Sequence, residues 1–122
     1  MNPRLLYLRE GDRLGIARQP LLNFHVSAVP VLDDDHRPVG VVALRDLLED
    51  VPRASTPAFT VTDTTPIEAA ARAIAEAGAH HAVVVDAAGR AVGMVSTLDL
   101  LQALLNLPVT HPAAFKEGHL AA

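Results

Sequence analysis

The sequence predicts a mixed α/β fold, of the α+β kind, made of two βαββα repeats in tandem. Residues 25–48 return in altered form at residues 78–101, and the two stretches align without a gap at a period of about 53 residues. In both stretches two β-branched runs flank a polar turn, and a leucine-rich segment follows. Because there are only two copies, each repeat is expected to close its core against the other, and function is expected between them.

The second repeat gives the clearer order of elements. A strand is expected at residues 58–61, after a proline-bounded linker. Thr65 supplies an N-cap hydroxyl, Pro66 suits the first helical position, and Glu68 places a carboxylate three residues past the cap, so a helix begins there. Gly78 stands where a left-handed C-terminal residue is expected. The apolar residues between them follow at helical spacing: Ile67, Ala70, Ala71, Ile74 and Ala77.

A hairpin and a last helix complete the second repeat. The β-branched run 81–85 and the run 91–95 flank the turn 86–89, which predicts two antiparallel strands. A final helix begins near Ser96 or Thr97 and runs through Leu104. Projected back by one period, the first repeat has a strand at 5–8, a helix near 14–22, strands at 27–32 and 38–43, and a helix at 44–50.

Two features complicate the first repeat and the end of the chain. Pro20 falls deep inside the helix expected at 14–22, where it removes a hydrogen bond, so a kink or an early stop is expected. The last segment holds two prolines and mixed polarity, and it is expected to be an extended tail or linker. The expected division is repeat 1 at residues 1–51, a linker at 52–57, repeat 2 at 58–107 and the tail at 108–122.

Composition and charge narrow the classes of function. Half of the 122 residues are hydrophobic but only 3% are aromatic, so the core must be built from Val, Leu, Ile and Ala. The formal charge is −4, and the scattered Lys and Arg residues lack the basic stripe that nucleic acid binding requires. The absence of cysteine excludes disulfides and suits a reducing cytosol. Charged residues interrupt the N-terminus before any signal or membrane segment, so a cytoplasmic protein without membrane contact is expected.

The repeated element order and two motifs carry a resemblance to a known family. Residues 26–33 read VSAVPVLD, and residues 93–99 read GMVSTLD. Over residues 5–105 the chain resembles the CBS domain pair, or Bateman module, named after cystathionine β-synthase. The resemblance implies two repeats packed sheet against sheet about a pseudo-twofold axis, with two clefts between them. It also implies adenosine-containing ligands in those clefts: AMP, ADP, ATP or S-adenosylmethionine.

The chemistry of the second motif suits such a ligand. Asp99 lies in the first turn of a helix, where its two carboxylate oxygens can accept both hydroxyls of a ribose. The Ser96 hydroxyl and the amides at the helix start, beside Thr97, suit a phosphate oxygen. The alternative is a capping box, in which Ser96 and Asp99 satisfy each other's backbone amides. In the first repeat Ala43 replaces the serine but Asp46 is kept, which favours ligand binding over capping.

The resemblance assigns these residues to two clefts. A basic residue near the start of the second hairpin is common in relatives that bind phosphorylated ligands. Because Ala43 lacks a hydroxyl, the second cleft should bind more weakly, by about 1 kcal/mol. The first cleft would combine Ser96, Thr97 and Asp99 with Val26, Ser27 and Ala28. The second would combine Asp46 with His80, His81 and either Thr60 or Thr62.

The sequence gives little support for a metal site or for catalysis. His80 and His81 are neighbours on an expected strand, so their side chains point to opposite faces and cannot chelate one ion. A hydrolase built from Ser96, His81 and Asp99 would lack a nucleophile elbow. No GxGxxG motif follows a strand, which excludes a Rossmann-type dinucleotide site. We therefore expect no metal, no cofactor and no catalytic residue.

The last helix bears on assembly. Its leucines cover more of the helix circumference than one buried face requires. The apolar residues of the equivalent segment in the first repeat fit one face: Leu44, Leu47, Leu48 and Val51. The surplus predicts a homodimer through these helices, unless the tail, through Val109 and Phe115, covers them. The leucines of the last helix are Leu98, Leu100, Leu101, Leu104, Leu105 and Leu107.

Taken with the resemblance, the sequence predicts a regulatory module that senses an adenine nucleotide. The alternative is a degenerate pair that binds no ligand and acts as a dimerisation or docking scaffold.

Overall fold

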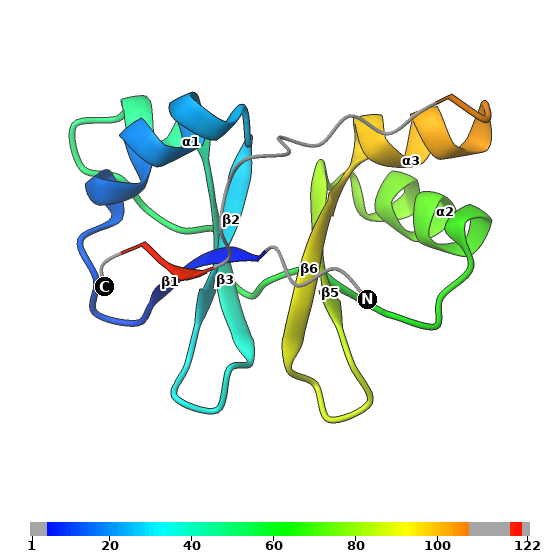
Figure 1. Cartoon of the computed structure of the whole chain (residues 1–122), viewed down its shortest axis with the longest axis horizontal. Coiled ribbons are helices and arrows are strands. Elements are labelled where there is room, and N and C mark those ends of the chain that lie inside the picture. Colours follow the sequence, from blue (N-terminus) through cyan, green and yellow to red (C-terminus); the bar gives the residue numbers. More distant parts are fainter. Residues whose placement is uncertain (1–4, 108–117, 121–122) are drawn as a thin grey trace.

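The two repeats lie side by side with their hairpins adjacent and their helices on the outer flanks (Figure 1). The computed structural model describes residues 5–107 and 118–120. Each repeat forms its own sheet, with the strand order β3-β2-β1-β7 in the first and β4-β5-β6 in the second. The mixed α/β fold with tandem βαββα repeats is confirmed.

The first repeat contains three strands, one α-helix and two 3₁₀ helices. β1 runs parallel to β2, and β2 runs antiparallel to β3. Its elements are β1 (Leu6–Arg9), η1 (Leu14–Ala17), α1 (Arg18–Phe24), β2 (Ala28–Leu32), β3 (Pro38–Ala43) and η2 (Leu44–Leu48).

The second repeat reproduces the strand pairing of the first, but both of its helices are α-helices. β4 runs parallel to β5, and β5 runs antiparallel to β6. The register shifts between Val84 and Val85 in β5, and at the equivalent place, between Val31 and Leu32, in β2. The repeat seen in the sequence is therefore also a repeat of strand register. Its elements are β4 (Thr60–Thr62), α2 (Ile67–Ala77), β5 (His81–Val85), β6 (Ala91–Ser96) and α3 (Thr97–Leu104).

Local predictions at two helices were wrong. Pro20 does not stop α1, which continues to Phe24. The proline lies in the first turn of that helix, where its missing N–H would have no partner anyway, and the change from 3₁₀ to α geometry comes before it. Thr65 does not cap α2, because Pro66 holds the N-cap position. The Thr65 hydroxyl instead accepts a hydrogen bond from the Thr62 amide at 3.2 Å.

The helix expected at residues 44–50 is a shorter 3₁₀ helix, and its apolar side chains do not share one buried face. Leu47 is fully buried, but Leu48 is 76% exposed and Val51 is 70% exposed. The backbone is already extended at Glu49. The linker that follows returns to β3, where Val41 and Ser55 exchange two backbone hydrogen bonds. This return shortens the helix and leaves the next apolar residues in solvent.

The end of the chain also contacts the first sheet. β7 (Gly118–His119) runs parallel to β1, and the Leu120 amide donates to the Tyr7 carbonyl at 2.9 Å. The half-buried Leu120 packs against the core of the first repeat. The segment expected as a tail therefore adds a strand there. Val109 and Phe115, which were expected to cover the last helix, lie outside the described residues.

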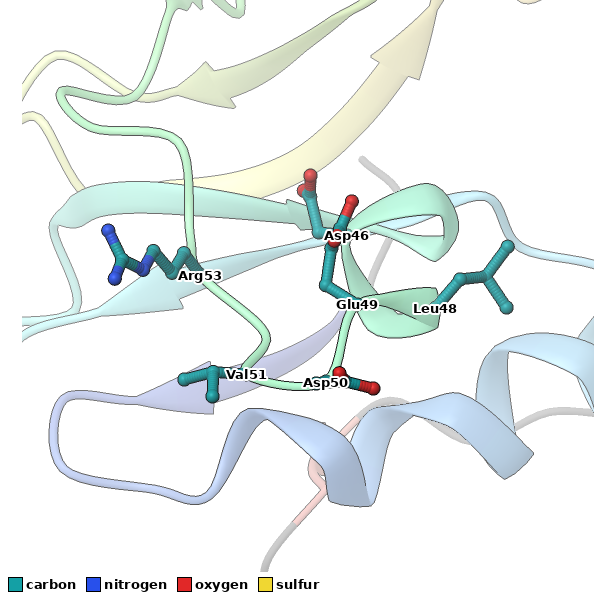
Figure 2. A pocket seen from close by; sticks show the side chains of 6 residues that line it. All are labelled: Asp46, Leu48, Glu49, Asp50, Val51 and Arg53. Atoms are coloured by element: carbon teal, nitrogen blue, oxygen red, sulfur yellow. The ribbon is translucent and has the colours of Figure 1, made fainter.

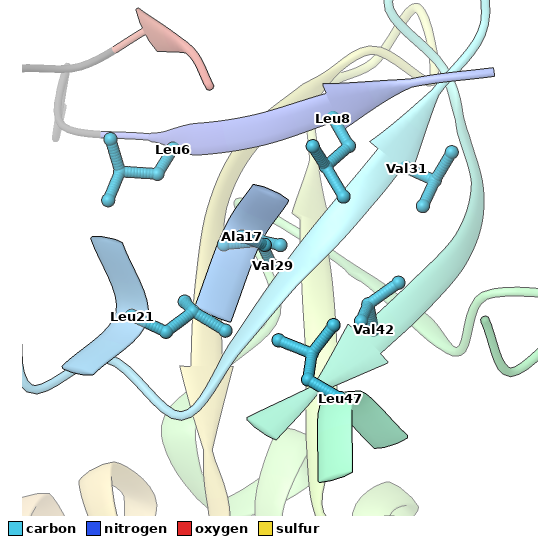
Figure 3. Packing of buried hydrophobic residues seen from close by; sticks show 8 residues of the cluster. All are labelled: Leu6, Leu8, Ala17, Leu21, Val29, Val31, Val42 and Leu47. Atoms are coloured by element: carbon cyan, nitrogen blue, oxygen red, sulfur yellow. The ribbon is translucent and has the colours of Figure 1, made fainter. Parts of the chain in front are cut away.

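A hydrophobic cluster common to both repeats joins them. Leu5, Leu32 and Val41 of the first repeat pack in one cluster with Val83 and Val85 of the second. Each repeat also has a cluster of its own, and Figure 3 shows how the side chains from the sheet and helices of the first repeat converge. Because the shared cluster is buried only when the repeats are together, neither half completes its core alone. The cluster of the first repeat contains Leu6, Leu8, Ala17, Leu21, Val29, Val31, Val42 and Leu47.

Candidate functional site

The start of the last helix is anchored in the same way in each repeat. The Leu44 amide donates to the Ser27 carbonyl at 2.8 Å, and the Thr97 amide donates to the His80 carbonyl at 3.0 Å. These bonds hold the first turn of η2 and of α3 beside the residue that precedes the middle strand. Each aspartate of the motif is therefore placed next to the strand entry of its own repeat.

Both aspartates also cap their helices. Asp99 Oδ2 accepts from the Ser96 amide at 3.0 Å, and Ser96 Oγ accepts from the Asp99 amide at 3.0 Å. Asp46 Oδ2 likewise accepts from the Ala43 amide at 2.9 Å. Ala43 carries no hydroxyl, yet Asp46 still caps its helix, since the carboxylate half of the box needs only a backbone N–H. The retention of Asp46 therefore no longer favours ligand binding over capping. Among the described residues each carboxylate makes one such bond, which leaves its other oxygen open to a ligand.

The amides at the start of α3 are mostly occupied. Thr97 donates its amide to His80, and Asp99 donates its amide to Ser96. The helix start was expected to offer free amides to a phosphate, but two of those amides already have acceptors inside the protein. A phosphate near Asp99 would therefore depend on side chains for most of its contacts.

Ser27 and His81 meet across the two repeats. Ser27 Oγ lies 2.8 Å from His81 Nε2, and His81 is also the backbone partner of Ser96 in its own hairpin. The sequence placed Ser27 in one cleft and His81 in the other. The structure brings Ser27, His81 and Ser96 together at one point between the repeats.

The environment of His81 links it to both aspartates. Burial lowers the pKa of His81, His80 lowers it further, and Asp99 and Asp46 raise it in part, so the net shift is downward. The half-buried ring is therefore uncharged near neutral pH. Because each carboxylate acts on it, the imidazole lies within electrostatic reach of Asp99 in its own repeat and of Asp46 in the other.

An open pocket of about 450 Å³ lies beside η2 and contains Asp46 (Figure 2). Its walls carry three carboxylates and one guanidinium, that of Arg53 in the linker. The pocket is not lined by His80, His81, Thr60 or Thr62, which the sequence grouped with Asp46. Arg53 was not predicted as a site residue. It reaches the pocket wall because Ser55, two residues later in the linker, pairs with β3. The lining residues are Asp46, Leu48, Glu49, Asp50, Val51 and Arg53.

The remaining candidate residues lie in different settings. Ala28 is 2% exposed within the cluster shared by the repeats, and Val26 packs against the core of the first repeat. The Thr62 hydroxyl lies 2.7 Å from the Thr65 hydroxyl, so it takes part in the turn before α2. Thr60, Thr62 and His80 are exposed.

Within the described ranges, 5–107 and 118–120, no three His, Asp or Glu side chains are grouped to hold a metal ion. In the same ranges, no helix has the length and apolar content needed to cross a membrane.

Comparison with known proteins gives a consistent result. A family model described as CBS domain matches residues 1–53 and 49–106. The UPF0053 protein MG146 homolog of Mycoplasma pneumoniae is 32% identical over 112 residues, which is 84% of this chain but only 26% of that protein. The chain therefore spans about a quarter of that curated relative.

Solved structures show the same fold. CBSX2 in complex with AMP matches with a TM-score of 0.71 and 26% identity, covering 84% of this chain and 88% of that one. CBSX2 is a CBS-pair protein from Arabidopsis thaliana. The CBS domain protein PAE2072 from Pyrobaculum aerophilum, complexed with AMP, matches with a TM-score of 0.70 and 27% identity, covering 87% and 94%. The cytosolic domain of the Mg²⁺ channel MgtE, in complex with ATP, matches with a TM-score of 0.69 and 29% identity, covering 84% and 46%.

Proposed function

This chain belongs to the CBS domain family, and from that premise we propose that it is a regulatory module that binds an adenine nucleotide between its repeats. The observation that carries the proposal is the meeting of Ser27 and His81, 2.8 Å apart, beside the helix start that holds Asp99. Relatives of the same fold bind AMP or ATP, which supports this class of ligand. We expect a cytoplasmic location, which suits a chain without cysteine.

The chemistry of the site supports a nucleoside with a phosphate. The Asp99 oxygen that is not used in the cap can accept hydroxyl groups of a ribose. His81, and the exposed His80 beside it, can donate to a phosphate oxygen, and a phosphate would favour the protonated form of either ring. The ligand candidates are AMP, ADP, ATP and S-adenosylmethionine.

A regulatory role requires that the ligand favour one arrangement of the repeats. A ligand that touches both repeats would bind best to one relative placement of them, and its differential affinity would set the size of the signal. The cluster shared by the two repeats is the contact through which such a change would pass. We propose no catalytic role for this chain.

A second candidate is supported by a different observation. Large apolar side chains are exposed on the last helix of the second repeat and at the end of η2 in the first. An apolar surface of this kind is suited to a protein contact. We propose that these helices form a homodimer, either together with ligand binding or, in the alternative function, as a scaffold that binds no ligand. The exposed residues are Leu48, Val51, Leu98, Leu101, Leu104, Leu105 and Leu107.

Thermal unfolding with each candidate ligand tests the first function. A ligand at a hundred times its Kd should stabilise the wild type by about 2.7 kcal/mol. Asp99→Asn keeps an acceptor for the Ser96 amide but loses the charge and the second acceptor oxygen, so the ligand shift should shrink. Glu76→Gln is the matched control, because it removes one negative charge from an exposed position on α2 outside the candidate site, and its ligand shift should equal that of the wild type. If none of the four ligands raises the midpoint, the scaffold function is favoured instead.

A further inference from the structure

The two repeats share an aspartate at the start of the last helix, but only the second repeat has a histidine at the start of its middle strand. Asp46 and Asp99 occupy equivalent places in the two repeats and make the same backbone bond. The first residue of the middle strand differs, because it is His81 in β5 and Ala28 in β2. Ala28 is 2% exposed and packs in the shared core. The pseudo-symmetry therefore supplies two carboxylates but one ring at this position.

The ring of His81 is held between the repeats. Its Nε2 lies 2.8 Å from Ser27 Oγ of the first repeat, while its backbone pairs with Ser96 of the second. Three charged or titratable groups act on it: His80 on the approach to β5, Asp99 on α3 and Asp46 on η2. The ring is thus within electrostatic reach of the aspartate of either cleft. Because Nε2 is paired with Ser27 Oγ, only Nδ1 remains to donate to an anion.

We propose that His81 is a specificity-determining residue shared by both clefts, and that it limits the chain to one phosphorylated adenine nucleotide at a time. This inference rests on the proposed function. A phosphate that approaches from either side needs the protonated imidazole to balance its charge, and the first phosphate takes that donor. An unphosphorylated nucleoside has no such need, so adenosine can still enter the second cleft.

Titration calorimetry with AMP and with adenosine tests the proposal. The wild type should bind one AMP per chain, and AMP-saturated protein should still bind adenosine. His81→Gln should weaken AMP at least about tenfold, which corresponds to the loss of one charge-assisted hydrogen bond, and should leave adenosine unchanged. His80→Gln is the comparison variant, because it removes the exposed imidazole beside His81. It should weaken AMP less than His81→Gln does and should leave the stoichiometry at one AMP per chain.

The pH dependence separates a specific role from a structural one. Because the pKa of His81 is lowered from 6.5, acidification from neutral pH should protonate the ring and tighten AMP in the wild type relative to His81→Gln at the same pH. Comparing the two proteins at the same pH cancels the effect of protonation of the AMP phosphate on the measured affinity.

Two equivalent AMP molecules per chain, or unchanged AMP affinity in His81→Gln, would overturn the shared role of His81 and leave the proposed function standing. Absence of binding by both AMP and adenosine would overturn the proposed function together with this inference.

Discussion

Gly40 lies against Thr56 so closely that a Cβ on the glycine would be 2.9 Å from Thr56 Cγ2. The same added atom would be 3.0 Å from the Ser55 carbonyl oxygen. Beside this contact Val41 donates to Ser55 at 2.9 Å and accepts from it at 2.7 Å. The linker is therefore fixed along the edge of the first sheet, and this fixed path carries Arg53 to the wall of the pocket beside Asp46.

Replacing Gly40 by alanine should destabilise the protein by about 1 to 3 kcal/mol, because the methyl group meets the backbone of the linker. The equivalent change Gly93→Ala is the control, since the nearest described atom to its added methyl is Val84 Cβ at 3.9 Å. Urea unfolding of the two variants measures the difference. Equal losses of stability would show that the contact with the linker is not what requires glycine at position 40.

The half-formed cap in the first repeat can be completed. Ser96→Ala should lower the free energy of unfolding by about 1 kcal/mol, because the Asp99 amide loses its acceptor. Ala43→Ser should raise it by about 0.5 to 1 kcal/mol, because a hydroxyl could accept from the Asp46 amide in the same way. Chemical denaturation of the two variants checks both signs. A destabilised Ala43→Ser variant would contradict the equivalence of the two helix starts.

Leu47 and Leu48 are neighbours with opposite environments. Leu47→Ala should cost about 2 to 5 kcal/mol, because the side chain is fully buried among the helices and strands of the first repeat. Leu48→Ala should change the stability by less than about 0.5 kcal/mol, since that side chain is 76% exposed. Calorimetric unfolding distinguishes these values. A large loss in Leu48→Ala at low protein concentration would contradict the exposure of that residue in the monomer.

The lowered pKa of His81 predicts a loss of stability in acid. His81 releases its proton more readily in the folded protein than in the unfolded chain. Its contribution to the free energy of unfolding is therefore fully present above the unfolded pKa of about 6.5. It falls as the pH drops below that value towards the folded pKa. The midpoint of thermal unfolding should therefore decrease less between pH 7 and pH 5 in His81→Gln than in the wild type. The same acid response in both proteins would exclude His81 as a source of it.

The exposed leucines of α3 predict self-association. Leu101, which is 53% exposed, lies on the apolar surface that we propose as the dimer contact. Leu101→Glu should convert a dimer to a monomer, because a charge would be buried in the contact. Ile67→Glu changes a similarly exposed residue, at 49%, on α2 and should leave the dimer intact. Light scattering over a range of concentrations measures both, and a monomeric wild type would contradict the proposal.

Most of the architecture could be predicted from the sequence, because local patterns specify it. The alternation of β-branched residues marked the hairpins, the spacing of Ala70 and Ile74 marked the helix, and the repeat carried the assignment back to residues 5–50. The motif that holds Asp99 and its counterpart Asp46 was visible for the same reason. The family resemblance rests on these patterns too.

The tertiary structure alone decided which residues meet between the repeats. The approach of Ser27 to His81 joins residues 54 positions apart, and it depends on how the two sheets pack rather than on either segment. The return of the linker to β3 shortened η2 and exposed Leu48, which a helical pattern could not show. The sequence by itself determined the elements, their duplication and the presence of His81 where the first repeat has Ala28. The packing of one repeat on the other decided that this single imidazole meets Ser27 and lies within electrostatic reach of both aspartates.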